Sequence, residues 1–552
     1  MSARIVTLDD QEKVNRLVSG YLIVAISALS VGMLLGMLQG LEHAGINLYP
    51  YLQPIIRTYY QGLTLHGVLN ALVWTTFFIC GFLTFVTTRS LNQPLKWLKL
   101  AWATFWVMVI GVLLAAWPML TNEATVLFTF YPPLKAHWAF YVGLTLVVAG
   151  TWFVTASLLA THGDWRREHP TERTPLPAFM SLVTFVMWCI ASIGITLEMV
   201  LLMIPWSLGL VADTNPLLAR TLFWYTGHPI VYFWLLPAYV SWYGMVPRQA
   251  GGKLFSDPMA RVAFILFLIL SIPLGLHHQY TDPGIPHGLK LVHAFLTFGV
   301  FFPSLLTFFN VVASLENGGR ARGGKGWFGW IRALPWSNPA LVPQLLAMLL
   351  FVFGGISGLV NASYQVNLAI HNTAWVPGHF HLTVGSATTL TFMGVSYWLI
   401  PLLSKRQLWN PKLALTQAWL WFTAMIIFSN VLHRLGLLDM PRRTAIGEAP
   451  YVLDAWRPLL PFVALGGTLL FISGMFWVVI VTYTALKGAP QTSDVEVPFC
   501  EAQDTAEHAP RALDHWRPWL AIATLLILIA YVPVLFHLLA TTGLSSPGFR
   551  VW

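Results

Sequence analysis

Long apolar segments alternate with short polar connections along the whole chain of 552 residues. A helix that crosses about 30 Å of hydrocarbon needs about 20 apolar residues. The hydrophobic pattern contains thirteen segments of roughly that length, near 18–40, 60–88, 98–120, 137–161, 177–205, 217–246, 260–279, 288–316, 341–361, 371–404, 413–437, 457–486 and 515–541. No connection is long enough for an inserted soluble domain. The pattern predicts an all-α polytopic membrane protein with about thirteen transmembrane helices, in which residues 1–552 form one transmembrane domain.

The composition supports lipid as the main solvent of the chain. Hydrophobic residues make up 56% of the sequence and charged residues only 10%, against about 25% charged residues in ordinary soluble proteins. Disordered, collagenous and disulfide-scaffold proteins are excluded on the same ground. The three cysteines, Cys80, Cys189 and Cys500, have no metal-binding or redox spacing.

The net charge of +9 is explained by membrane topology. The first twenty residues are polar and do not form a cleavable signal peptide, so we expect the first apolar segment to remain as an anchor. With the N-terminus in the cytoplasm, 22 of the 31 Lys and Arg residues fall on inner segments, for example Arg166, Arg167 and Arg173. Cytoplasmic loops carry such an excess. The positive charge therefore indicates orientation, and nucleic-acid binding is not expected.

Several of the 17 histidines lie inside predicted spans, where ionisable residues are rare and usually functional, and six of them lie at one depth. These histidines are His66, His228, His277, His278, His379 and His381. Four of them lie about 6–11 residues into spans that enter from outside, which is roughly 9–17 Å below the outer surface. His277 and His278 lie near the outer end of the seventh span. A single such histidine would most simply be a hydrogen-bonded core residue, but six at one depth predict metal ligation.

The spacing of the histidines divides them between metals. His379 and His381 are two positions apart, about 200° around a helix, so they suit one ligand to each of two metals on opposite sides. A helix that lies between two haems would direct one of these histidines towards each haem.

His277 and His278 diverge by only about 100° and can reach one ion. A third imidazole from another helix would complete a site that copper accepts, and His228 is the natural third ligand. Tyr232 lies one helical turn deeper on the face of His228, so its phenol can approach the same centre.

A file of polar side chains runs from this centre towards the inner surface. Tyr232, Tyr239 and Tyr243 recur at helical spacing in one predicted span, and Ser304, Thr307 and Asn310 recur in another. Such a file can carry protons; the alternative is that these residues only pack the helices together.

Several motifs in fixed order, over nearly the whole chain, resemble the catalytic subunit I of the haem–copper oxidases. They are YYQGLTLHGVLNAL, NEATVLFTFYPPLKAHWAFY, ARTLFWYTGHPIVYFWLLPAY, GLHHQYTDPGI and HNTAWVPGHFHL. The resemblance is closest to the B-family, ba-type cytochrome c oxidases.

This resemblance implies a ligand set and a reaction. His66 and His381 would be the axial ligands of a low-spin haem b, and His379 the proximal ligand of a high-spin haem of the a type. His228, His277 and His278 would hold the copper, CuB, and Tyr232 would be joined covalently to His228. The implied reaction is the reduction of O2 to water with electrons from cytochrome c, coupled to proton uptake and pumping. The implied partners are a subunit II with a dinuclear copper site and a small third subunit, in a prokaryotic inner cell membrane.

The resemblance also gives roles to the remaining polar residues. The tyrosine-led file would be the proton path analogous to the K-channel, although Asn310 stands where a Thr is expected. An outer cluster would surround the haem propionates; it consists of His371, Asn372, Asp282, Arg442 and Arg443. Asn367 stands where an Asp is expected, which weakens a proton-loading role at that position. The alternative for Arg442 and Arg443 is that they are solvated loop charges.

Three rival functions differ in observable features. A quinol oxidase shares this subunit and differs mainly in its electron donor. Nitric oxide reductase has non-haem iron and glutamates at the copper site, and lacks the equivalent of Tyr232. A non-catalytic haem-binding membrane protein would have no CO-binding iron. Ile230, where the A family has a Glu, predicts a single proton path.

Overall fold

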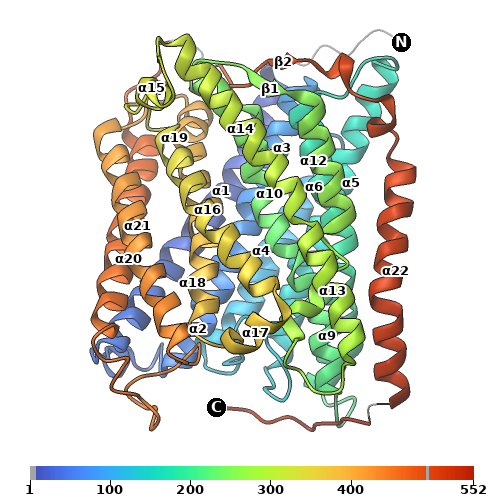
Figure 1. Cartoon of the computed structure of the whole chain (residues 1–552), viewed down its shortest axis with the longest axis vertical. Coiled ribbons are helices and arrows are strands. Elements are labelled where there is room, and N and C mark those ends of the chain that lie inside the picture. The colour runs from blue at the N-terminus through green and yellow to red at the C-terminus, as the bar shows by residue number, and fades with distance from the viewer. Residues whose placement is uncertain (1–7, 493–495, 542, 552) are drawn as a thin grey trace.

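The computed structural model describes residues 8–492, 496–541 and 543–551. Figure 1 shows long helices that run side by side between two ends of the molecule. The first helices are α1 (Leu8–His43), α2 (Tyr59–Gly67), α3 (Thr75–Leu91), α4 (Leu98–Leu120), α5 (Trp138–Glu168), α6 (Leu176–Ala191), α7 (Ile193–Leu197) and α8 (Ile204–Ser207). The middle of the chain forms α9 (Pro216–Gly227), α10 (Pro229–Gly244), α11 (Val246–Gln249), α12 (Asp257–Leu270), α13 (His287–Gly299), α14 (Phe301–Ala321) and α15 (Gly329–Ala333).

The remaining elements complete the bundle. They are α16 (Val342–Ala362), α17 (Tyr364–Ile370), α18 (Trp375–Leu382), α19 (Thr389–Ser404), α20 (Pro411–Leu437), α21 (Leu460–Lys487) and α22 (Trp516–Thr541). Short 3-10 helices are η1 (Tyr49–Leu52), η4 (Gly275–Gln279), η6 (Ala506–His508) and η7 (Arg511–Asp514). The strands β1 (Leu254–Ser256) and β2 (Ala502–Asp504) pair in parallel, with Leu254 opposite Ala502.

Eleven helices of the described chain are long and apolar enough to cross a membrane. The other two predicted spans, 217–246 and 260–279, are present but interrupted. The first divides into α9 and α10 at His228, because Pro229 has no N–H group to continue the helix. The second ends as α12 at Leu270, and Pro273 precedes the separate turn η4. The interruptions therefore fall where three of the candidate metal-binding histidines lie.

Three π-helical segments interrupt other spans. They are η2 (Val68–Trp74), η3 (Glu198–Met203) and η5 (Thr383–Thr388). π-Helical turns often occur at functional sites. Here η2 begins two residues after His66, and η5 begins two residues after His381, so both flank candidate ligands.

Candidate metal centres

Three imidazoles converge where α9 meets α10. The ligand nitrogens of His228, His277 and His278 all lie within 4.8 Å of one another. Nδ1 of His228 is 3.0 Å from Nε2 of His277 and 3.3 Å from Nε2 of His278. Three buried nitrogens at these distances fit one metal ion, and a three-imidazole set suits copper.

Neighbouring side chains orient this cluster. The Trp224 ring stacks on His278 with 3.8 Å between ring centroids and 12° between ring planes. The Thr297 hydroxyl donates to the carbonyl oxygen of His293 at 2.6 Å. It therefore accepts from Nδ1 of His277, 3.0 Å away. This hydrogen bond leaves Nε2 of His277 unprotonated and directed into the cluster, as ligation requires.

Tyr232 lies beside the cluster, as the helical spacing predicts. Its ring centroid is 4.9 Å from that of His228, and the side chain is buried. Nε2 of His228 is buried without a hydrogen-bond partner among the described residues. The phenol and the partnerless nitrogen thus share one apolar pocket.

A second pair of imidazoles, His66 and His381, forms a different arrangement. The rings are nearly parallel, with 16° between their planes and 6.3 Å between their centroids. Nδ1 of His66 donates to the carbonyl oxygen of Gly32 at 2.8 Å, and Nδ1 of His381 donates to that of Pro377 at 2.7 Å. Both Nε2 atoms are therefore free to ligate, and the separation leaves room for one metal ion between the rings.

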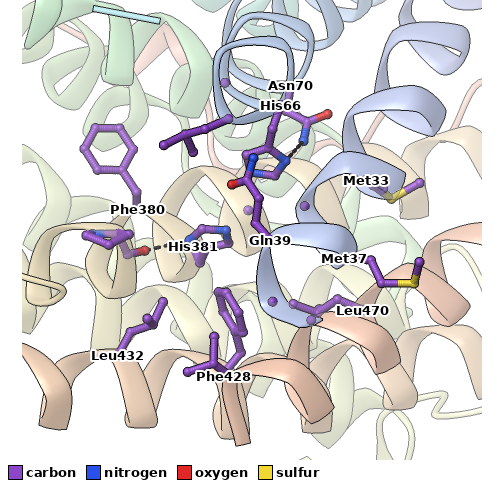
Figure 2. A pocket seen from close by; sticks show the side chains of 18 of the residues that line it. Met33, Met37, Gln39, His66, Asn70, Phe380, His381, Phe428, Leu432 and Leu470 are labelled. Carbon is purple, nitrogen blue, oxygen red and sulfur yellow. Dashed lines mark hydrogen bonds between the residues drawn. The ribbon is translucent and has the colours of Figure 1, made fainter. Parts of the chain in front are cut away.

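The paired imidazoles line a cavity of about 270 Å³. Figure 2 shows them together with apolar side chains such as Met33 and Phe428. α1 approaches closely at Gly36, where a Cβ atom would lie 2.6 Å from Cε1 of His66. A cavity with apolar walls and two axial nitrogens fits a flat iron macrocycle.

His379 faces a different cavity from His381, as their spacing predicts. Its Nδ1 donates to the Ser357 hydroxyl at 2.9 Å, and that hydroxyl donates to the carbonyl oxygen of Gly354. This cavity, of about 340 Å³, is lined by His379 and also by the three-histidine cluster and Tyr232. A metal held by His379 would therefore share a cavity with a metal held by the cluster.

The predicted propionate residues gather at the rim of the two cavities. Arg442 lines both cavities, and its backbone N–H donates to the carbonyl oxygen of Asn372 at 2.8 Å. Burial and the neighbouring Arg442 together lower the pKa of Arg443 to about 9. In the described part of the chain neither guanidinium has a carboxylate partner, because Asp282 pairs instead with Arg220 at 2.8 Å. Two partly buried cations without acids fit an anionic ligand rather than solvated loop charges.

His371 lies in the same rim. Its Nδ1 is 2.8 Å from the amide oxygen of Asn367. Burial, together with the nearby cations Arg442, Arg220 and Lys290, lowers the pKa of His371 to about 4. The neutral amide at position 367 therefore positions a neutral imidazole among cations.

The structure brings together part of the predicted row of polar side chains. Tyr239 and Tyr243 of α10 are fully buried, and their hydroxyls form no hydrogen bond of ordinary geometry within the described chain. Tyr239 faces Ser304, and Tyr243 faces Thr307, across the contact with α14. The unpaired hydroxyls mark a polar track through an apolar region.

Asn310 is the exception in this file. Its amide oxygen accepts from the backbone N–H of Ser256 at 3.1 Å, and its amide nitrogen donates to the Ser256 carbonyl oxygen at 2.7 Å. The side chain thus holds strand β1 to α14, which differs from the predicted role in proton transfer.

Sequence reasoning missed several buried charged residues around these sites. Lys290 donates to the carbonyl oxygens of Tyr280 and Asp282, at 2.9 and 2.7 Å. The Glu42 carboxylate accepts from the backbone N–H groups of Ile446 and Gly447, and so holds the loop that follows Arg443. Each of these residues is an ionisable group at the edge of an apolar segment, which is the signal that could have identified it.

Glu198 is a further buried acid, and it gives a testable prediction. It begins the π segment η3, is fully buried, and neither carboxylate oxygen has a hydrogen-bond partner among the described residues. An unpaired buried charge costs several kcal/mol, so we expect an uncharged carboxylic acid.

Glu198→Gln, also neutral, should preserve haem content and turnover within about twofold, and should remove a protonated-carboxyl infrared band. Glu198→Lys should prevent assembly; wild-type protein without that band would contradict the assignment.

The structure is a helical membrane protein with two cavities for metals. One cavity contains two paired imidazoles, and the other is shared by a single imidazole and a three-imidazole cluster. These features define a haem–copper type oxidoreductase. A family model described as "Cytochrome C and Quinol oxidase polypeptide I" matches residues 16–469, so the chain belongs to this family. The family places the protein in a membrane, with haem and copper as cofactors and with partner subunits.

Individual relatives agree with this assignment. Cytochrome c oxidase subunit 1 of Thermus thermophilus is 47% identical over 545 residues, which cover 96% of each chain. Alternative cytochrome c oxidase subunit 1 of Bradyrhizobium diazoefficiens is 24% identical over 472 residues, covering 78% of this chain and 76% of the relative. The solved structure of a heme-copper terminal oxidase dimer matches with a TM-score of 0.92 and 39% identity, over 98% of this chain and 95% of that chain. The predicted fold and the predicted function as a terminal oxidase subunit I are confirmed.

Proposed function

We propose that this subunit reduces O2 to water in the cavity between His379 and the three-histidine cluster. One observation carries the proposal: a single cavity contains an isolated imidazole, a three-imidazole cluster and the phenol of Tyr232. A nearby cavity with two parallel imidazoles supports a separate electron-carrying site. The bound metals would supply electrons and the coordination positions for O2.

The geometry supports a specific set of ligands. His66 and His381 would hold a low-spin haem b, since both Nε2 atoms are free and the rings are parallel. His379 would hold a high-spin haem of the a type, and His228, His277 and His278 would hold copper. With His66 and His381 both as ligands, an iron held there would have no open position for O2, so the paired site would supply electrons only.

Tyr232 would hold a proton on its phenol oxygen at the edge of the reaction cavity. Tyr239 and Tyr243, with Ser304 and Thr307 opposite, would bring protons from the inner surface of the membrane. We also propose a covalent bond between Nε2 of His228 and the ring of Tyr232, which the adjacent rings and the partnerless nitrogen support. Its formation would replace the N–H bond and one ring C–H bond, with O2, the proposed substrate, accepting the two electrons and two protons. The proposed pumping follows from the family resemblance, and Asn367 provides no carboxylate for it.

Arg442 and Arg443 would bind the carboxylates of the haems. Both guanidinium groups are partly buried; Arg442 lines both cavities and Arg443 lines that of the paired imidazoles, and carboxylates would offset the cost of burying them. His371, Asn372 and Asp282 would complete this rim.

Electrons would come from cytochrome c through a subunit II with a dinuclear copper site, and a small third subunit would complete the complex. The described chain supports the need for such a partner, because Cys80, Cys189 and Cys500 are free and lie far apart in the sequence. We place the N-terminus in the cytoplasm of a prokaryotic cell, from the distribution of Lys and Arg.

The test is metal and haem analysis of the purified complex, combined with its CO spectrum. We expect haem b, an a-type haem that binds CO, and a copper ion that is lost in His278→Ala. That variant separates this copper from any copper in subunit II.

Other outcomes would identify the rivals. Non-haem iron in place of the cluster copper would indicate a nitric oxide reductase. Two six-coordinate haems without CO binding would indicate a non-catalytic haem protein. Oxidation of quinol but not of cytochrome c would indicate a quinol oxidase.

A further inference from the structure

The turn η4 carries two of the three cluster histidines, His277 and His278, and a residue of the last helix closes it. The Tyr531 hydroxyl of α22 accepts from the backbone N–H of Gly275 at 3.0 Å. The same hydroxyl donates to the carbonyl oxygen of Ile272 at 3.2 Å. The Tyr531 hydroxyl therefore both accepts and donates a hydrogen bond to the backbone that immediately precedes His277 and His278.

His293 of α13 makes a second connection between α22 and the turn. The backbone N–H of Leu276 donates to Nδ1 of His293 at 3.3 Å. Nε2 therefore carries the proton and donates to the carbonyl oxygen of Ala530 on α22, 3.0 Å away. The His293 ring also packs edge-on against Tyr531, with 5.0 Å between centroids.

The turn packs closely against its neighbours at Gly275. A Cβ atom at Gly275 would collide with the carbonyl oxygen of Trp224 on α9 and lie 2.5 Å from the Tyr531 hydroxyl. Trp224 also stacks on His278, so the same residue confines both the backbone and a ligand ring. Gly275, His293 and Tyr531 are all buried.

We infer that α22 positions the copper ligands through Tyr531 and His293. In Figure 1 α22 lies at the edge of the bundle, and only 22% of its most apolar stretch is buried. Despite this exposure, α22 supplies the Tyr531 hydroxyl, which binds η4 directly, and the Ala530 carbonyl, which binds it through His293. These contacts hold η4 in the orientation in which Nε2 of His277 and Nε2 of His278 both face Nδ1 of His228. Tyr531 and His293 are positioning residues, and this inference rests on the proposed copper site.

The test measures copper retention by the intact purified complex during dialysis against a copper chelator. Loss of groups that orient metal ligands typically weakens metal binding about 10–100-fold. We therefore expect Tyr531→Phe to lower the affinity for the cluster copper by about that factor, with haem content unchanged. The matched control is Tyr225→Phe, because the Tyr225 ring packs on Tyr531 at 4.7 Å while its hydroxyl makes no hydrogen bond to η4 in the described chain.

A second pair of variants keeps the inference testable if Tyr531→Phe does not assemble. His293→Leu should lose copper as Tyr531→Phe does, whereas His293→Gln, which can still accept and donate, should restore most of the retention. Wild-type retention in Tyr531→Phe or in His293→Leu would overturn the inference and leave the proposed function intact. If instead the wild-type complex contained no copper at the three-histidine cluster, the proposed function would be overturned.

Discussion

Tyr232→Phe should lower the rate of oxygen consumption at least about 100-fold, because a positioned proton donor typically contributes 10²–10⁴-fold to a reaction. Tyr232 is the one tyrosine that lines the cavity shared by His379 and the cluster in the described chain. Phenylalanine keeps the ring and its packing on Phe267, 5.5 Å away, and removes only the hydroxyl. The rate is measured with an oxygen electrode on purified complex, with haem and copper content determined on the same sample.

A matched control separates loss of the phenol from general damage. Tyr397 of α19 is also buried, but its hydroxyl donates to Gln417 at 2.9 Å and does not line the cavity. Tyr397→Phe should retain most of the turnover. If Tyr232→Phe consumed oxygen at more than half the wild-type rate with full metal content, Tyr232 would not be the proton donor.

Helical periodicity predicted those parts of the site that depend on one helix at a time. The two-residue spacing of His379 and His381 placed them on opposite faces, and the structure directs them into different cavities. The four-residue spacing of His228 and Tyr232 placed their rings side by side, although the helix restarts at Pro229 between them. All thirteen predicted spans are present in the described chain, but proline interrupts two of them near the metal-binding histidines.

Contacts between distant segments could not be predicted in this way. Gly275 and Tyr531 are 256 positions apart, and no local pattern relates them. Asn310 shows the same limit: its spacing fits the proton file, but its amide is used by Ser256, a partner that only the folded chain brings near. Periodicity gives the face of a helix, whereas the role of a side chain depends on what packs against that face.

Tyr239→Phe and Thr307→Val should each slow steady-state oxygen consumption about tenfold or more, because each removes a hydroxyl from the predicted proton path. Both residues are buried, so bulk water cannot replace the missing group directly. Proton uptake, followed with a pH-sensitive dye, should slow in parallel, while haem spectra and copper content stay unchanged. Wild-type proton uptake in both variants would place the path elsewhere.

Asn310→Thr is the informative comparison, because it introduces the residue expected from the family and removes two hydrogen bonds to β1. If Asn310 acts mainly as the structure indicates, this variant should lose about 1–3 kcal/mol of stability and keep its turnover per folded complex. If Asn310 instead relays protons, the threonine should preserve or increase the rate of proton uptake. The two outcomes differ in thermal denaturation and in proton uptake, so one variant shows whether the path includes position 310 or passes from Thr307 to the surface by another side chain.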